Sequence, residues 1–397
     1  MRIYIVFVAV VVLALLHGCT SKTKNTGRSS ANLLENNTDS VYIDSVLFSL
    51  PREYSGNGII QLMGDSIYFV DRMYTTITAY SLDGAIGKTN LGKGEGPNEV
   101  TDVLFVWRHK GDNYVYFPPK VWRFNSDWQL IKQYFTNFGA SMRQTEELLY
   151  ATTTNEETKA VYTVQFGPYT MMPLAYMDDE RLLFPVAYGT PHLNAYEKVQ
   201  YYQKVHTLGQ FNSDFEVIQI VGNKPSCFLD YRFIPNHDYT YFDYSDNKLF
   251  VGFEPDSLIY VYDKDMRFLY SFGRSGIDMN MDYVETSTID EGLKNENYYR
   301  ARAQEGYYEY VNYFKTPGVL LRTYKTGARD SNAKYSIENP TRLQVYKDEE
   351  LVYDFPVEKR FRIIGYREPY FYADGIVDEE NERLGVYRFR FNLKLKE

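Results

Sequence analysis

The chain repeats a pattern of short strands and turns, and this repetition limits its possible folds more than any other feature. Residues 65–94 and 247–276 align over thirty positions without a large gap. In each copy a polar residue precedes a strand, a second strand ends at Tyr80 or Tyr262, and an acid-containing turn leads to a third strand. Self-similarity of this kind indicates a repeat architecture.

Weaker copies of the pattern fill most of the remaining chain. They begin at Asp112, lie at 180–222 and 318–355, and end with 369–393. Alternating apolar and polar residues in these copies mark strands with two unlike faces. Aromatic residues make up 17% of the chain, and aromatic side chains favour strands. We therefore expect an all-β protein, namely a β-propeller whose four-stranded antiparallel blades form a ring.

The sequence leaves the number of blades at six or seven. Counting strand pairs gives seven if residues 147–166 form a blade of their own, and six if a neighbouring blade absorbs them. An early strand at 41–50 has no partner nearby, and the last unit, which ends at 393–395, lacks an outer strand. We expect these two segments to pair, because an N-terminal strand that closes the last blade removes two exposed sheet edges.

The N-terminus has the pattern of an export signal. One cation precedes the apolar run 3–16, which is shorter than the roughly 20 residues that a membrane span needs. Leu16, Gly18 and Cys19 then resemble the lipobox of bacterial lipoproteins, although His17 replaces the small residue that is usual there. The alternative is an ordinary secretory signal, or a cysteine present by accident.

The lipobox resemblance implies cleavage before Cys19 and attachment of lipid to its thiol. We then expect a signal peptide at 1–18, a flexible polar tether at 19–40 and the propeller domain at 41–397. The protein would be lipid-anchored in the cell envelope, on the periplasmic face of the outer membrane. Cys227 would be the one other cysteine, so no internal disulfide is expected.

A glycine-rich run, LGKGEGPNEV at 91–100, raises the question of a phosphate-binding loop. It lacks the third glycine of a dinucleotide-binding fingerprint, and a β-like segment follows it instead of a helix. Gly273 occupies the equivalent place in the aligned repeat, so a structural turn between blades is the favoured interpretation. The alternative is a ligand-binding turn at the mouth of the central channel. Its residues would be Gly94, Glu95, Gly96, Pro97 and Glu99.

The same run resembles a motif of six-bladed, TolB-like propeller lipoproteins, written G-x-G-x-G-P-x-E. That family is abundant in gut-type Gram-negative bacteria, and the function of most of its members is unknown. The resemblance implies six blades and an envelope location. It implies no catalytic residues, so none are carried over to this chain.

The sequence shows no pattern typical of a metal, cofactor or nucleic-acid site. The net charge of −9 disfavours nucleic-acid binding, which usually needs a basic face. Residues 374–382 are rich in acids but lack the alternating order of a calcium loop, so a solvated hairpin tip is favoured. The histidines beyond the signal form no metal-binding motif; they are His109, His192, His206 and His237.

Tyrosine clusters and one insertion are further candidate binding features. The clusters at 201–202, 239–244 and 307–313 either pack within strands or stack on sugars and peptides. Segment 281–306 interrupts the β pattern with helix formers. We expect a helical or mobile insertion on one face, where binding loops often lie.

These observations favour a non-enzymatic binding or scaffold protein with a protein or glycan partner. The rival hypothesis is an envelope carbohydrate-active hydrolase or lyase that uses carboxylates at the channel mouth. Two carboxylates about 5–10 Å apart across the mouth would favour the enzyme, whereas scattered acids would favour binding.

Overall fold

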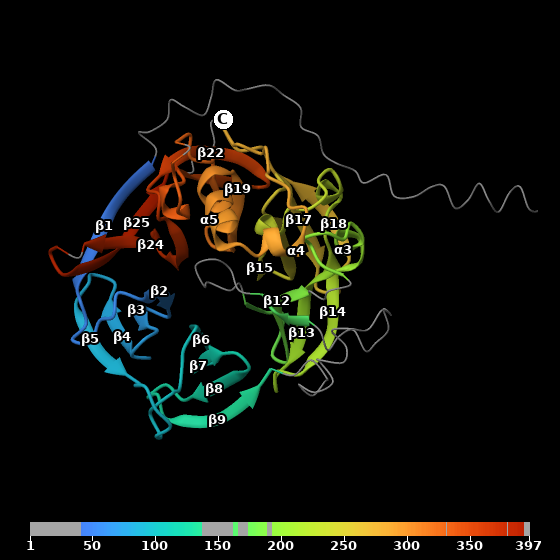
Figure 1. Ribbon diagram of the computed structural model, residues 1–397. Coiled ribbons are helices and arrows are strands. Elements are labelled where there is room, and N and C mark those ends of the chain that lie inside the picture. The colour runs from blue at the N-terminus through green and yellow to red at the C-terminus, as the bar shows by residue number, and fades with distance from the viewer. Residues whose placement is uncertain are drawn as a thin grey trace, which may run out of the picture.

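The computed structural model describes residues 41–136, 162–165, 174–188, 193–330, 332–378 and 380–392. The described residues form six antiparallel β-sheets, arranged as the blades of a six-bladed β-propeller around a central axis (Figure 1). The expected all-β propeller is confirmed.

Each blade is built from consecutive strands, with the first strand nearest the axis. Blade 1 contains β2 (Gly58–Met63), β3 (Ser66–Asp71), β4 (Ile77–Ser81) and β5 (Ile86–Asn90). Blade 2 contains β6 (Phe105–His109), β7 (Asp112–Phe117), β8 (Lys120–Phe124) and β9 (Leu130–Phe135). Blade 3 contains β10 (Tyr162–Val164), β11 (Ala175–Tyr176), β12 (Arg181–Tyr188), β13 (His206–Asn212) and β14 (Val217–Asn223).

The second half of the ring follows the same order. Blade 4 contains β15 (Thr240–Ser245), β16 (Lys248–Phe253), β17 (Ile259–Asp263) and β18 (Phe268–Phe272). Blade 5 contains β19 (Tyr307–Phe314), β20 (Val319–Lys325), β21 (Thr341–Lys347) and β22 (Glu350–Val357). Blade 6 contains β23 (Arg362–Arg367), β24 (Tyr370–Asp378), β25 (Arg383–Phe391) and, on its outside, β1 (Val41–Ser49).

The chain closes its ring by pairing its two ends. Strand β1 runs antiparallel to β25, from Val41 opposite Phe391 to Ser49 opposite Arg383. Figure 1 shows the blue N-terminal strand beside the red C-terminal strand. The predicted closure is therefore confirmed, and it covers the edge that β25 would otherwise expose.

The seven-blade alternative is wrong, because the described residues form a ring of six blades. Within that range the structure describes 162–165, and β10 there pairs with β12 as the innermost strand of blade 3. The neighbouring blade thus absorbs this strand, which gives six blades.

Aromatic side chains fill the spaces between adjacent blades. The ring of Phe48 on β1 lies 4.3 Å from that of Tyr80 of blade 1 in a tilted arrangement, and thereby joins the last blade to the first. Between blades 5 and 6, Phe314 and Phe371 meet edge to face at 5.2 Å. Such contacts combine large buried area with specific geometry, which explains the high aromatic content of the chain.

Helices occur mainly in the connections between blades. Segment 281–306 contains α4 (Ile289–Gly292) and α5 (Asn295–Gln304), and α3 (Gln200–Lys204) precedes β13. The described residues also contain the short 3₁₀ helices η3 (Ser226–Leu229), η4 (Pro235–His237) and η5 (Ser336–Glu338). Among the described residues, no helix has both the length and the apolar character required to cross a bilayer.

Candidate functional site

The entrance face is the face of the ring on which the inner strand of each blade begins. The second strand of each blade ends there, because the two strands are antiparallel: Gly58 pairs with Asp71 in blade 1, and Tyr307 with Lys325 in blade 5. Charged residues that follow second strands therefore gather on this face from different blades.

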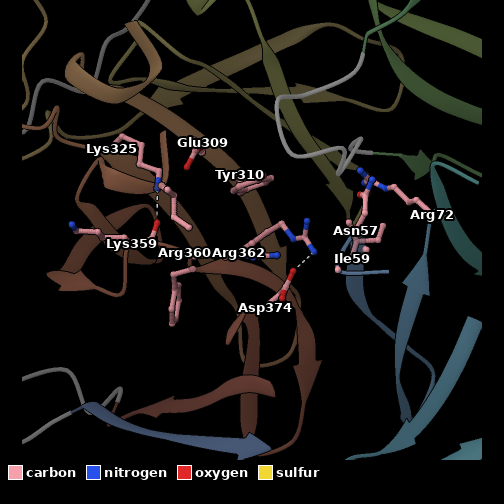
Figure 2. A pocket seen from close by; sticks show the side chains of 14 residues that line it. Asn57, Ile59, Arg72, Glu309, Tyr310, Lys325, Lys359, Arg360, Arg362 and Asp374 are labelled. Carbon is pink, nitrogen blue, oxygen red and sulfur yellow. Dashed lines mark hydrogen bonds and ion pairs between the residues drawn. The ribbon is translucent and has the colours of Figure 1, made fainter. Parts of the chain in front are cut away.

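A cavity of about 250 Å³ lies on the entrance face beside the inner strands of three adjacent blades. We call it the mouth cavity, and Figure 2 shows its lining side chains. Residues 56–59 and Arg72 come from blade 1, Glu309, Tyr310 and Lys325 from blade 5, 359–362 and Asp374 from blade 6, and Ile337 from η5.

Cations outnumber carboxylates in the mouth cavity. Among the described residues that line it, two carry negative charge, Glu309 and Asp374, whereas five carry positive charge. The whole chain has a net charge of −9, so the cavity has the opposite sign to the chain as a whole. The five cations are Arg72, Lys325, Lys359, Arg360 and Arg362. A concave site with one sign of charge concentrates ligands of the other sign.

Arg362 is fixed between blades 6 and 1. It forms an ion pair with Asp374, and its Nη2 also donates to the carbonyl oxygen of Ile60 at 3.1 Å. Arg362 and Asp374 are 7% and 3% exposed. Removing one partner of a buried ion pair leaves an uncompensated charge and is strongly destabilising, so Asp374 holds the guanidinium in place.

Lys325 brings a second buried cation to the opposite wall. Its ammonium group donates to Thr341 Oγ1 at 2.7 Å and to the carbonyl oxygen of Lys359 at 2.6 Å (dashed in Figure 2). Burial lowers the pKa of Lys325, an effect that the charge of Glu309 opposes. A nearby anion favours the charged form of an amine, so an anionic ligand would stabilise this site.

Arg72 follows β3 and lies on the blade 1 side of the cavity. Its backbone N–H donates to the carbonyl oxygen of Asn57 at 2.9 Å, which fixes the main chain. Its Nε and Nη2 atoms are buried and have no hydrogen-bond partner in the part of the chain that the structure describes. Burial, followed by the charge of Arg362, lowers the pKa of Arg72 to about 10.

A buried ionic network lies behind Glu309 and attaches helix α5 to blade 4. Arg302 of α5 donates to both carboxylate oxygens of Glu254 at 2.8 Å, and its guanidinium lies 3.5 Å from the ring centre of Tyr307. His237 lies 2.5 Å from the carboxylate of Glu305. Burial lowers the pKa of His237, although the hydrogen bond to Glu305 opposes this effect. The network fixes the insertion beside the cavity.

An exposed aromatic ledge borders the mouth cavity. We define the ledge as Tyr299 of α5 with Tyr335 and Ile337 at η5. These side chains are 47%, 59% and 50% exposed, and the two tyrosine rings lie 6.2 Å apart. Ile337 also lines the cavity, so the ledge continues from its rim.

A larger hollow of about 870 Å³ adjoins the mouth cavity. Lys359 and Phe361 line both spaces. The hollow extends past Arg342 and Arg329 between blades 5 and 6. A ligand with its end in the mouth cavity therefore has room for a longer chain.

The glycine-rich run connects β5 to β6 and lies outside the residues that line the mouth cavity. The carboxylate of Glu99 accepts a hydrogen bond from the backbone N–H of Gly96 at 2.9 Å. A Cβ atom at Gly94 would clash with the same carboxylate. The glycines and Glu99 thus form a turn closed by its own side chain, while Glu95 and Pro97 are exposed. Cys19 lies outside the described residues.

Most residues of the tyrosine clusters belong to the core. Tyr201, Tyr241 and Tyr307 are at most 3% exposed, so core packing explains them better than ligand stacking. The expected strand at 201–202 is wrong, because these residues lie on helix α3. Tyr310 is different because it lines the mouth cavity. Within 374–382, Asp374 is buried against Arg362, so the interpretation of this residue as part of a solvated tip is wrong.

No individual cation of the mouth cavity stands out in the sequence, because the cavity forms from distant segments. The repeat alignment does contain a usable signal. Arg72 stands seven residues after Asp65, and Glu254 stands seven after Asn247, so each directly follows the second strand of its blade, β3 or β16. Charged residues at this repeated position lie on the entrance face.

Fold and site together define a six-bladed β-propeller with a cationic cavity on its entrance face. No family model matches the sequence, and no curated protein matches it. The structure is similar to a member of the DUF4221 family from Bacteroides vulgatus, with a TM-score of 0.65 and 14% identity over 88% of this chain and 98% of that one. A putative exported protein from Bacteroides fragilis gives a TM-score of 0.49 and 14% identity, over 88% and 95%. At such identity the likeness supports the fold alone.

Proposed function

We propose that the protein is a non-enzymatic binding protein of the cell envelope, anchored by lipid at Cys19 on the periplasmic face of the outer membrane. It binds a protein or glycan partner on its entrance face. The observation that carries this proposal is the mouth cavity, where five cations face two carboxylates in an acidic protein. Propellers commonly present such a face on a rigid ring.

The rival function, a carbohydrate-active hydrolase or lyase, is less well supported by the geometry. A glycoside hydrolase needs one carboxyl group kept protonated by an apolar environment. In the mouth cavity Asp374 is paired with Arg362, and Glu309 lies 3.8 Å from Arg302. In the view of Figure 2, Tyr310 and Arg362 lie between the two carboxylates. Both carboxylates therefore act as partners of arginines.

Binding on the entrance face can be tested with a charge reversal. Arg360→Glu places a negative charge at the cavity, and Lys88→Glu makes the same change on the exposed outer strand of blade 1. Immobilised protein is incubated separately with the glycan and the protein fractions of an envelope extract. We expect one fraction to be retained by the native protein and by Lys88→Glu but not by Arg360→Glu. Equal retention by both variants would refute the assignment of this face.

Lipid anchoring is tested separately. Cys19→Ser removes the thiol, so the protein should move from the membrane pellet to the supernatant in detergent-free buffer. If the variant still pellets with membranes, the anchor is not at Cys19.

The enzyme hypothesis also has a direct test. Reducing ends released from acidic and neutral glycans are measured for the native protein, Glu309→Gln and Asp374→Asn. Release by the native protein that either substitution abolishes would establish catalysis and overturn the non-enzymatic proposal.

A further inference from the structure

We propose that the mouth cavity is a subsite for the carboxylate group of an acidic sugar, and that Arg72 is its principal ligand-binding residue. This inference rests on the proposed binding function and specifies the class of partner: a glycan with a uronic acid unit.

The free edge of Arg72 defines the chemistry of the ligand. Nε and Nη2 project from the same side of a guanidinium group, and both are buried without a hydrogen-bond partner among the described residues. Buried donors without partners are destabilising. The two N–H groups on this edge match the two oxygens of a carboxylate, so a carboxylate that displaces the atoms now covering the edge would satisfy both at once. Figure 2 shows the guanidinium end of Arg72 directed toward the other labelled side chains.

The neighbouring charges favour an anion at the same place. Arg362 lies close enough that its charge, after burial, lowers the pKa of Arg72. Asp374 already neutralises Arg362, but no carboxylate is paired with Arg72 among the described residues. An anion beside Arg72 would remove this repulsion, since opposite charges within a few ångströms favour the charged forms of both groups.

The size of the cavity restricts the ligand to about one sugar ring. Sites for drug-sized molecules usually measure 300–1,000 Å³, and the mouth cavity has about 250 Å³. The adjoining hollow of about 870 Å³ can hold the units that follow. A glycan whose terminal acidic sugar occupies the mouth cavity, with its following sugars in the hollow, fits both volumes.

The aromatic ledge favours a sugar over a simple carboxylic acid. Tyr335 precedes the cavity-lining Ile337 by two residues, its ring lies 6.2 Å from that of Tyr299, and the two tyrosines are 59% and 47% exposed. The C–H face of a pyranose ring is apolar, so it can cover a tyrosine ring while its hydroxyl groups remain in water. Tyrosine suits such a position because its ring is apolar and its hydroxyl group is polar.

The test compares four probes by ligand-observed NMR titration of the mature chain. Glucuronate supplies sugar and carboxylate, its methyl ester and glucose supply the sugar without the charge, and trialanine supplies a carboxylate without a sugar. A single sugar should bind with a dissociation constant of about 1 mM. We expect glucuronate to bind at least about tenfold more tightly than each of the other three probes. The methyl ester and glucose lack the charged bidentate contact to Arg72, and trialanine lacks the sugar.

Matched arginine variants locate the contact. Arg72→Gln removes the charge, and Arg72→Lys keeps the charge but removes the planar edge. Arg267→Gln changes an exposed arginine on the outer hairpin of blade 4. Both Arg72 variants should bind glucuronate at least about tenfold more weakly, whereas Arg267→Gln should bind it like the native protein. The melting temperature of each variant shows whether it folds. If Arg72→Gln does not fold, Arg72→Lys still tests the contact.

The outcomes separate this inference from the proposed function. If glucuronate binds equally to native protein and to Arg72→Lys, or no more tightly than its methyl ester, the subsite is refuted. If trialanine binds as tightly as glucuronate, the assignment to a sugar is refuted. In each case the envelope-extract experiment with Arg360→Glu still decides independently whether the entrance face binds a partner.

Discussion

Truncation of Phe48 to alanine tests whether the terminal strand holds the ring together. Phe48 lies on β1, is 2% exposed, and packs in a cluster with Ile60 and Tyr80 of blade 1 and Leu384 of blade 6. Its ring lies 4.3 Å from that of Tyr80. The substitution would therefore leave a cavity between the last blade and the first.

The expected loss follows from this burial. Phe→Ala in a well-packed core costs about 3–5 kcal/mol, which includes both the lost transfer free energy and the cavity. Unfolding entropy is about 2.1 cal/mol/K per residue, or about 0.7 kcal/mol/K for a domain of about 350 residues. A loss of about 4 kcal/mol should then lower the melting temperature by about 5 °C.

Thermal unfolding followed by circular dichroism measures this shift. Leu47→Ala is the matched control, because Leu47 is the preceding residue of β1 and its side chain is 40% exposed on the other face of the strand. It should cost less than about 1 kcal/mol and lower the melting temperature by less than about 2 °C. If Phe48→Ala and Leu47→Ala lower the melting temperature equally, packing of β1 against blade 1 does not stabilise the ring.

Two further predictions concern the glycine-rich turn and the buried histidine. Glu99→Ala and Gly94→Ala should each lower the free energy of unfolding, measured in urea, by about 0.5–1.5 kcal/mol, because both remove the Glu99–Gly96 hydrogen bond. The double variant should then lose no more than the larger of the two single losses. Losses that add up in the double variant would contradict this. Burial lowers the pKa of His237 below 6.5, so the unfolded chain binds more protons at this residue than the folded chain does. The free energy of unfolding should therefore fall as the pH drops below about 6.5, by up to about 1.4 kcal/mol per pH unit. His237→Gln should weaken this dependence between pH 7.5 and 5.5, and an unchanged slope would exclude His237 as its source.

The strand positions and the propeller fold were predictable because aligned repeats place equivalent strands at equivalent positions. The alignment of 65–94 with 247–276 places strands at Ile67–Val70 and Leu249–Phe253, and the structure has β3 and β16 there. The closing strand was predictable for a related reason, since a strand without a partner at each end of a ring implies the pairing of the two ends. The blade count was less certain because nothing in the sequence around Tyr162–Val164 assigns β10 to blade 3, and its pairing with β12 is seen only in the structure.

The mouth cavity was not predictable at the level of single side chains. Its cations occur at positions as far apart as Arg72 and Arg362, and each one alone is an ordinary charged residue in a chain that is 24% charged. A repeat alignment predicts which charges lie on the entrance face, but not which blades bring them within contact. That depends on side-chain burial and on the partners that each charge finds, such as Asp374 for Arg362.

Ring closure and ligand binding depend on the same seam between blades 6 and 1. Arg362 of blade 6 donates across this seam to the carbonyl oxygen of Ile60, and Arg72 of blade 1 lines the same cavity. In the sequence these blades are the most distant pair, and the pairing of β1 with β25 brings them together. A substitution that loosens the seam should therefore weaken binding at the mouth cavity without touching any residue that lines it. Phe48→Ala, assayed for glucuronate binding well below its melting temperature, measures this dependence directly. Unchanged affinity would show that the cavity holds its shape independently of the closing strand.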